Sequence, residues 1–208
     1  MLSNRNENKV LLRGRLEALP APSHTNHGVL YSVLPMVVRR LSGAEDRLNV
    51  VASEAQLEGL ALKPGDGLTV RGEVRTFNNR SGVGSRLVVS VFARELTREE
   101  GEDENSLELS GTLCKPPSLR TTPLGRTICD MILAVNRRYG RADYLPCIAW
   151  GSLAHRCGEL RVGDRLRLSG RLQSRTYTKV VEDHTEERVA FEVSIMSLEE
   201  EPEEFSDE

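Results

Sequence analysis

The 208-residue chain has only nine aromatic residues and no long hydrophobic segment. No apolar run approaches the ~20 residues of a membrane-spanning helix, and the polar N-terminus lacks the apolar core of a signal peptide. We therefore expect a soluble protein of the cytoplasm. Hydrophobic residues make up 38% of the chain, which predicts a packed core rather than wholesale disorder. A chain of this length has room for two domains of about 100 residues.

The sequence also lacks the residue patterns of a metal site or a catalytic centre. No C-x-x-C spacing and no neighbouring histidine pair accompany the four cysteines, which are Cys114, Cys129, Cys147 and Cys157. Gly82-Val83-Gly84 leads into a predicted strand, so it is not a phosphate-binding loop before a helix. His24 and His27 lie in a predicted loop, where solvation is a simpler interpretation than metal or nucleic-acid contact. We predict no metal, no cofactor and no enzymatic activity, with the cysteines reduced.

The formal net charge is only −3, which as a bulk value argues against a nucleic-acid partner. The charge is segregated along the chain, however. Residues 8–98 carry a surplus of +5 and residues 105–198 a surplus of +4, whereas residues 99–104 carry −5 and residues 199–208 carry −7. Acidic runs commonly do no more than solvate chain ends. Two basic bodies nevertheless keep an anionic partner open, because the mean charge describes neither of them.

The two basic bodies are copies of one another. A shift of 97 residues places Gly14 on Gly111 and Arg40 on Arg137, and it also aligns the following aspartates, Asp46 and Asp143. After one inserted residue, a shift of 98 aligns the two Gly-Asp turns and the glycines that follow them. Repetition at ~100 residues indicates domain duplication, because solenoid repeats are shorter. The predicted organisation is a first domain at residues 1–98, an acidic linker at 99–104, a second domain at 105–198 and an acidic tail at 199–208.

Each copy is predicted to be a small β-barrel. Apolar and polar residues alternate along residues 107–113, 166–172 and 189–195, as expected of half-buried strands. Ser53-Glu54-Ala55-Gln56 has capping-box spacing and predicts a short helix, which residues 151–160 match in the second copy. Glycines inside the first and fourth strands fit the sharp coiling of a closed barrel. Five strands with one helix between the third and fourth predict an all-β protein of two tandem OB-folds, a fold that binds oligonucleotides or oligosaccharides.

The second copy holds most of the aromatic residues, several of them next to arginines. Bases stack on aromatic side chains for roughly 1–3 kcal/mol each, while guanidinium groups hold phosphates. Opposite its apolar residues, the fourth strand also carries a polar row that includes Arg171 and Arg175. Packing at strand ends and a soluble barrel exterior are the alternative interpretations. The candidate nucleic-acid-binding residues are Tyr139, Tyr144, Trp150, Tyr177, Arg137, Arg138, Arg171 and Arg175.

The first copy lacks this aromatic set. The positions that match the four aromatic candidates hold Ser42, Arg47, Ser53 and Asn79. Tyr31 matches the apolar Ile128 and is assigned to the core, which leaves Phe77 as the one plausible stacking residue. The first copy is therefore expected to bind single strands weakly, or to serve as a spacer and assembly surface.

Residues 105–198 resemble the DNA-binding domain of the bacterial single-stranded DNA-binding protein (SSB) family. The resemblance is carried by Leu109-Ser110-Gly111-Thr112-Leu113, Leu124-Gly125-Arg126-Thr127, Ile132-Leu133-Ala134-Val135-Asn136-Arg137, the run from Asp143 to Gly151 and the run from Val162 to Tyr177. It implies that Tyr139, Tyr144, Trp150 and Tyr177 stack on DNA bases. The first copy resembles the same domain in degenerate form.

The resemblance also has implications for assembly and partners. Tandem-domain relatives reach four OB-folds as dimers, which implies a homodimer. The acidic tail of the family ends in a Pro-Phe carboxylate that recruits replication and repair proteins. Here Phe205 is followed by Ser206-Asp207-Glu208, so this chain departs from the pattern. Partner binding through Phe205 and a plain solvating tail both stay open.

The leading hypothesis is a nucleoid-associated protein that binds single-stranded DNA with little sequence preference and protects it in replication, recombination or repair. The rival hypothesis is a non-enzymatic OB-fold adaptor, primosome-like or from a mobile element, that mainly binds proteins. RNA binding is a weaker variant, because an OB groove does not reveal the sugar from sequence.

Overall fold

The structure is a computed structural model that describes residues 7–79, 87–137, 140–181 and 184–200, without the side chains of Lys179 and Val181. The chain divides into two compact units. The first-barrel unit contains Lys9–Ser106 and Leu172–Phe191, and the second-barrel unit contains Leu107–Arg171 together with the segments before Lys9 and after Phe191. Within the described residues, no helix is both long and apolar enough to cross a membrane.

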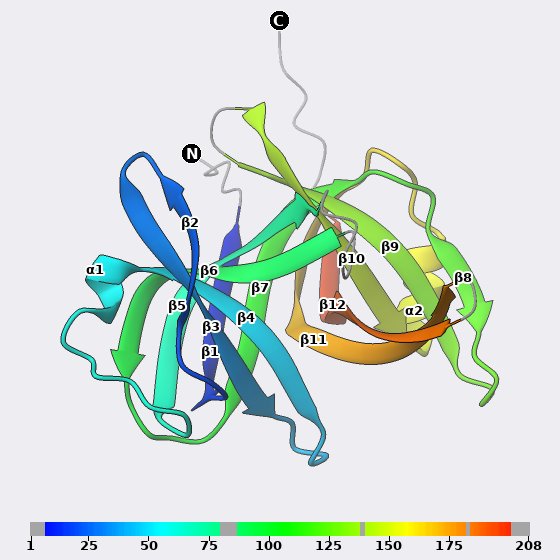
Figure 1. Ribbon diagram of the computed structural model, residues 1–208. Helices are drawn as coiled ribbons and strands as arrows, with labels where there is room; N and C mark the ends of the chain where they lie inside the picture. The colour runs from blue at the N-terminus through cyan, green and yellow to red at the C-terminus, as the bar shows by residue number, and fades with distance from the viewer. Residues whose placement is uncertain (1–6, 80–86, 138–139, 182–183, 201–208) are drawn as a thin grey trace, which may run out of the picture. The chain divides into compact units, whose positions relative to one another are not determined.

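The first repeat forms a barrel of five long strands with one short additional strand and one helical turn (Figure 1). β1 pairs with β3 and β5, β3 pairs with β4, β4 pairs with β6 in parallel, and β5 pairs with β6, which closes the ring. The elements are β1 (Asn8–Leu16), β2 (Ala21–Asn26), β3 (Val29–Arg39), β4 (Glu45–Ser53), α1 (Glu54–Leu57), β5 (Gly67–Asn78) and β6 (Leu87–Arg98).

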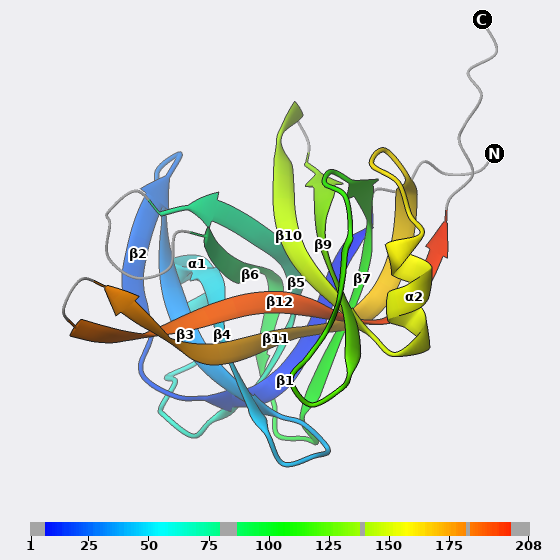
Figure 2. The ribbon, with the colours of Figure 1, turned by 90° about the vertical axis from the view of Figure 1, so that its right-hand side faces the viewer.

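The second repeat closes in the same order, from β7 through β9, β10, β12 and β11 back to β7. Figure 2 shows its two last strands running side by side as a long hairpin. We call the outer part of this hairpin, Leu172–Phe191, the arm. It belongs to the first-barrel unit. The elements are β7 (Glu104–Leu113), β8 (Ser118–Thr121), β9 (Thr127–Asn136), β10 (Ala142–Trp150), α2 (Ser152–Gly158), β11 (Arg165–Val181) and β12 (His184–Glu200).

Strand register confirms that the two barrels are copies. Gly14 pairs with Leu68 in the first barrel, and the shifted residues Gly111 and Leu166 pair in the second. The cores correspond as well, because many buried residues of one barrel have a buried counterpart in the other. Such pairs are Leu12 and Leu109, Leu34 and Met131, Leu48 and Leu145, Val70 and Leu168, and Val91 and Val193. The predicted all-β fold of two OB barrels is therefore confirmed.

Both predicted helices are present between the third and fourth long strands. The capping box forms as expected, since the Gln56 side-chain oxygen accepts a hydrogen bond from the Ser53 backbone N–H at 2.9 Å. In the second repeat, α2 begins after Gly151, which adopts φ = 60°. One feature differs from the sequence prediction, because β2 and β8 are short extra strands. The last two strands of the second repeat have 17 residues each, compared with 12 in the first repeat.

Four glycines allow the strands of each barrel to cross at close range. A Cβ atom added to Gly14 or Gly111 would lie within 3.0 Å of a backbone carbonyl oxygen on β3 or β9. A Cβ at Gly72 or Gly170 would meet a carbonyl oxygen of β6 or β12 in the same way. The four glycines are required because the backbones approach one another without room for a side chain.

The acidic segment 99–104 is bound to the first barrel. The Glu99 N–H donates to the Gly67 carbonyl, and the Glu100 carboxylate accepts from the Gly67 N–H, both at 3.0 Å. The Asp103 carboxylate accepts a hydrogen bond from the Arg39 backbone N–H at 2.5 Å. Glu104 opens β7 and lies 3.7 Å from the Arg13 guanidinium. The Glu100, Asp103 and Glu104 carboxylates therefore contact backbone donors and a cation of the first barrel.

The glycine crossings predict the effect of one added methyl group. Gly170→Ala should lower the free energy of unfolding by about 1–3 kcal/mol, because overpacking forces the backbone apart. Gly158→Ala is the matched control, since its Cβ would meet only ordinary contacts with Leu119 from 3.4 Å outward. Urea unfolding of both variants measures the difference. Equal stability of the two variants would contradict the close crossing.

Candidate nucleic-acid interface

Two of the predicted stacking residues lie on one face of β10. Tyr144 is 53% exposed and Trp150 is 40% exposed, whereas Asp143, Leu145 and Cys147 are buried on the opposite side of the strand. Strand geometry places side chains six residues apart on the same face, about 20 Å from one another. β10 therefore presents two large aromatic side chains on the outside of the second barrel.

Cross-strand register adds an arginine that the sequence prediction missed. Trp150 pairs with Ile128 on β9, and Ile128 pairs with Arg120 on β8. Two strand spacings put Arg120 about 10 Å from Trp150 on the same face. The Arg120 guanidinium is 2.5 Å from the Asp130 carboxylate, and this hydrogen bond raises the pKa of Arg120. No sequence pattern predicts β8, which is only four residues long, so this neighbour could not be found.

Arg137 has a structural partner. Its Nε donates to the Asp143 Oδ2 at 2.5 Å, and its Nη2 donates to the Asp143 Oδ1. The Asp143 side chain is fully buried. The first barrel repeats the arrangement at the shifted positions, where Arg40 forms two hydrogen bonds of 2.8 and 2.5 Å to the buried Asp46. Each arginine therefore neutralises a buried carboxylate, whatever else it contacts.

The remaining described candidates lie on β11. The Arg175 guanidinium carbon is 5.6 Å from the centre of the Tyr177 ring, a cation–π arrangement on one face of the arm. Arg171 is half-buried, and its Nε is buried without a hydrogen-bond partner among the described residues. Tyr139, Arg138 and Phe205 lie outside the described residues. Tyr144 and Trp150 thus lie on β10, and Arg175 and Tyr177 lie on the arm, whereas Arg137 and Arg171 lie outside both groups.

The first barrel carries an aromatic cluster that the sequence analysis missed. The Tyr31 ring stacks on His24 with centroids 5.1 Å apart and an interplanar angle of 13°, and it contacts Phe92 at 5.4 Å. The Arg94 guanidinium lies 5.2 Å from the Phe92 ring centre. Placing Tyr31 in the core was wrong, because β3 buries the alternate positions, including Leu34. Alternation along β3 was the signal that could have corrected it.

The cysteines of the second barrel are free thiols. Cys129, Cys147 and Cys157 are buried, and burial raises the pKa of Cys157 to about 11 and that of Cys147 further. These thiols stay protonated at neutral pH, which makes them poor nucleophiles. In the described part of the chain, no three His, Cys, Asp or Glu side chains gather in a way that could hold a metal ion.

Comparison with known proteins places this architecture in a family. The sequence profile of the Single-strand binding protein family matches residues 104–199, the second repeat. A single-stranded DNA-binding protein of Thermus thermophilus is 30% identical over 201 residues, which cover 82% of this chain and 76% of that protein. The chain belongs to the single-strand binding protein family. The family resemblance of the sequence is therefore confirmed.

The tandem arrangement is shared with a solved member of this family. The crystal structure of the wild-type single-stranded DNA-binding protein from Thermus aquaticus superimposes with a TM-score of 0.75 at 28% identity. The superposition covers 96% of this chain and 95% of the Thermus chain. The single-stranded DNA-binding protein A of Bacillus subtilis is 36% identical over 80 residues, or 35% of this chain. The likeness to the Thermus protein therefore extends over both repeats.

The ion pair of Arg137 predicts a stability effect. Arg137→Ala should lower the free energy of unfolding by about 3–5 kcal/mol, because it leaves the buried Asp143 without its cation. The exposed Arg175 serves as a control, and Arg175→Ala should change stability by no more than about 0.5 kcal/mol. Urea unfolding followed by circular dichroism measures both. A small loss in Arg137→Ala would mean that Asp143 does not depend on this arginine.

Proposed function

We propose that the protein binds single-stranded DNA with little sequence preference and protects exposed strands during replication, recombination or repair. The observation that carries the proposal is the outer face of β10, where Tyr144 and Trp150 are exposed on an OB barrel. Large aromatic side chains left in solvent offer faces on which unpaired bases stack, and stacking tolerates any sequence because every base has a π-face. The Thermus and Bacillus relatives are single-stranded DNA-binding proteins, which supports the same ligand.

Arginines supply the contacts to phosphate in this proposal. Arg120 lies on the same face of the barrel as Trp150, and the exposed Arg175 lies beside the Tyr177 ring. Each arginine therefore places a guanidinium group on the same surface as a stacking residue. Arg171 is half-buried on the same strand as Arg175, and we assign its guanidinium a further phosphate contact. Tyr139 and Arg138 complete the proposed site. Arg137 contributes mainly by pairing with the buried Asp143. The function is binding, and it requires no catalytic residue or cofactor.

We extend the proposal to assembly and location. A homodimer would bring four OB-folds together, as in tandem-domain relatives of the family. The protein would act in the cytoplasm on nucleoid DNA, and its acidic tail with Phe205 would contact replication or repair proteins. Measurement of the mass in solution tests the dimer, which a monomeric mass would exclude. The adaptor alternative is not favoured, because the relatives matched over both repeats bind single-stranded DNA.

Binding should depend on the β10 aromatic pair. Trp150→Ala and Tyr144→Ala should each weaken binding of a fluorescein-labelled oligo(dT) about tenfold, since one stacked base contributes roughly 1–3 kcal/mol. Fluorescence anisotropy at low salt measures the affinity. Val162→Ala is the matched control, because Val162 is 55% exposed in the turn before β11. Trp150→Phe should retain most of the affinity.

The same titration distinguishes the possible failures. Absence of binding by the folded wild-type protein would reject single-stranded DNA as the ligand. Wild-type affinity in both alanine variants would show that the site is elsewhere on the protein. An oligo(rU) of the same length, used as a competitor, tests the sugar preference.

Arginine contacts should appear in the salt dependence. The logarithm of the binding constant should fall linearly with the logarithm of salt concentration, with a slope near −0.7 per phosphate neutralised on a single strand. Arg175→Ala should make this slope less steep by about 0.7. Arg161, an exposed arginine in the turn after α2, provides the control. If Arg161→Ala and Arg175→Ala change the slope equally, the contribution of the arm is non-specific.

A further inference from the structure

We propose that the first barrel carries a second base-stacking site, formed by His24, Tyr31 and Phe92 with Arg94 at its edge. Its ligand is an unpaired nucleobase with its adjoining phosphate. The proposal rests on the proposed binding of single-stranded DNA, and it goes beyond the expectation that the first repeat binds single strands weakly or serves as a spacer and assembly surface.

Strand register shows why sequence alignment misses this site. Trp150 pairs with Ile128 in the second barrel, and the same two positions of the first barrel hold Ser53 and Tyr31. In the second barrel the aromatic residue of this pair lies on β10, whereas in the first barrel it lies on β3, the strand that corresponds to β9. Directly paired residues have Cβ atoms only about 4.5–5.5 Å apart, so the exchange keeps an aromatic side chain at the same place on the barrel. A position-by-position alignment compares Trp150 with Ser53 and therefore shows only the loss of an aromatic residue.

The rings of the cluster belong to three different strands. His24 on β2 pairs with Tyr31 on β3, and β4 separates β3 from β6, which carries Phe92. Ser53, the β4 residue opposite Tyr31, is small, so no bulky side chain at that position separates Tyr31 from Phe92. His24 is exposed, whereas Tyr31 and Phe92 are half-buried. Tyr31 and Phe92 therefore support the exposed His24 ring, whose outer face is open to a ligand.

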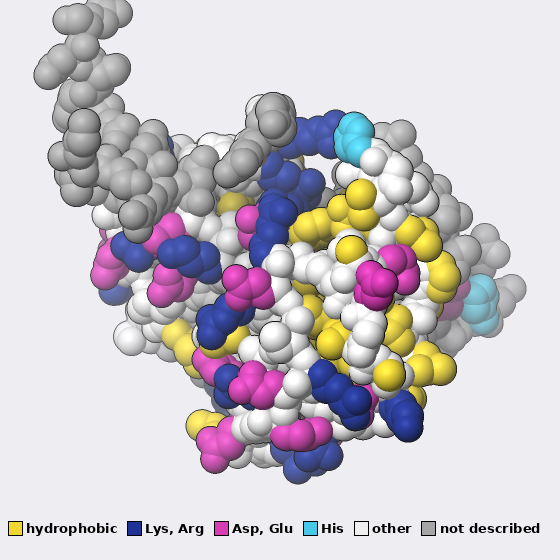
Figure 3. All heavy atoms as spheres, turned by 90° about the vertical axis from the view of Figure 1, so that its left-hand side faces the viewer, with side chains coloured by type: hydrophobic (Ala, Val, Ile, Leu, Met, Phe, Trp, Pro, Cys, Tyr) yellow, Lys and Arg dark blue, Asp and Glu magenta, His cyan; other side chains and the backbone are white. Residues whose placement is uncertain are grey.

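Hydrophobic side chains gather on the side of the molecule that Figure 3 shows, the side on which β2 and α1 lie in Figure 1. Val29, two residues before Tyr31 and therefore on the same face of β3, is 42% exposed. Exposed apolar surface next to aromatic rings is suited to contact with the flat face of a nucleobase. Such a patch on the surface of a protein commonly marks a binding site.

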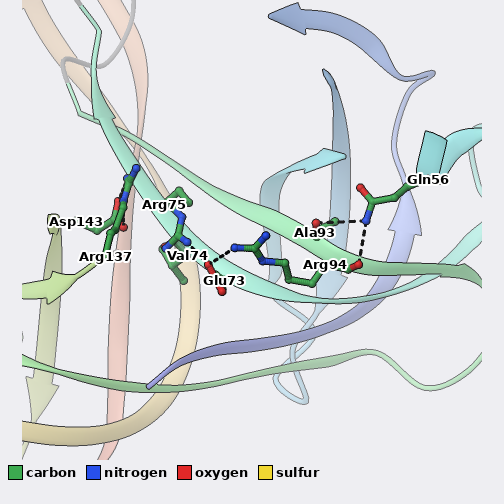
Figure 4. A network of polar contacts seen from close by, with 8 residues as sticks. All are labelled: Gln56, Glu73, Val74, Arg75, Ala93, Arg94, Arg137 and Asp143. Atoms are coloured by element: carbon green, nitrogen blue, oxygen red, sulfur yellow. Dashed lines mark hydrogen bonds and ion pairs between the residues drawn. The ribbon is translucent and has the colours of Figure 1, made fainter. Parts of the chain in front are cut away.

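The edge of the cluster is positively charged and structurally fixed. Figure 4 shows Glu73 between Arg75 and Arg94, with the Arg94 contact at 3.0 Å. Two guanidinium groups therefore share one carboxylate, and these three side chains together carry a net charge of +1 beside Phe92. Gln56 donates hydrogen bonds to the carbonyls of Ala93 and Arg94 at 3.3 and 3.1 Å, and these bonds fix the backbone under Arg94. Arg94 is 56% exposed, so it can reach a phosphate without leaving the ring.

Photocrosslinking tests the site directly in the full-length protein. An oligo(dT) that contains 5-iodouracil is irradiated with the wild-type protein, and the crosslinked peptides are identified by mass spectrometry. We expect crosslinks at His24, Tyr31 or Phe92 in addition to crosslinks in the second repeat. The crosslinks in the first repeat should persist in the Tyr144→Ala/Trp150→Ala double variant.

Affinity measurements complete the test. In the same double variant, Tyr31→Ala and His24→Ala should each weaken the remaining oligo(dT) binding about tenfold, whereas Tyr31→Phe should not. Leu19→Ala is the control, since Leu19 is 61% exposed in the β1–β2 connection. Thermal unfolding verifies that each variant is folded, and His24→Ala removes only an exposed ring if Tyr31→Ala proves unstable.

The outcomes separate this proposal from the proposed function. If crosslinks are confined to the second repeat and His24→Ala binds like its parent, the second site is overturned while single-stranded DNA binding stands. If the wild-type protein binds no single-stranded DNA, both proposals fail together.

Discussion

Backbones approach one another closely where the strands of each barrel cross. At Gly14 and Gly72 in the first barrel, and at Gly111 and Gly170 in the second, an added Cβ would lie within 3.0 Å of a carbonyl oxygen on the crossing strand. A small barrel can close only if its strands coil sharply, and side chains at the crossings would hold them apart. The glycines therefore determine the curvature of the sheet and which positions face outward.

Closure constrains the interior far more than the exterior. The buried leucines and valines correspond between the two barrels, and so do the paired Arg40–Asp46 and Arg137–Asp143. A buried carboxylate without its cation would cost several kcal/mol, so both members of each pair have to be kept together. The outer face has no such requirement. There, Trp150 of one barrel corresponds to Ser53 of the other, and Tyr31 takes the cross-strand position.

The sequence was sufficient to predict the features that recur with a local period. Alternation and the shifted glycines predicted two OB barrels, and the capping box at Ser53 predicted the first helix, all of which the structure contains. Tyr144 and Trp150 were stacking candidates through the family resemblance rather than through a local period, and the structure exposes both side chains. Contacts between strands distant in sequence were not predictable. The position of Arg120 beside Trp150 depends on β8, and the face of Tyr31 depends on its register with β2 and β4. The pairing of Arg137 with Asp143 was not predicted, because the sequence showed the two residues only as aligned repeats of Arg40 and Asp46 and Arg137 was assigned to nucleic-acid binding.

Charge shows the same difference between a bulk property and a local one. Part of the acidic segment 99–104 is held on the first barrel, where Glu100 and Asp103 accept backbone hydrogen bonds and Glu104 lies near Arg13. At physiological ionic strength, exposed charges farther apart than about 8 Å are largely screened from one another. A DNA phosphate therefore responds to the guanidinium groups within that distance rather than to the net charge of −3. For this reason a mildly acidic chain can present a surface suited to a polyanion, provided that its carboxylates are engaged elsewhere.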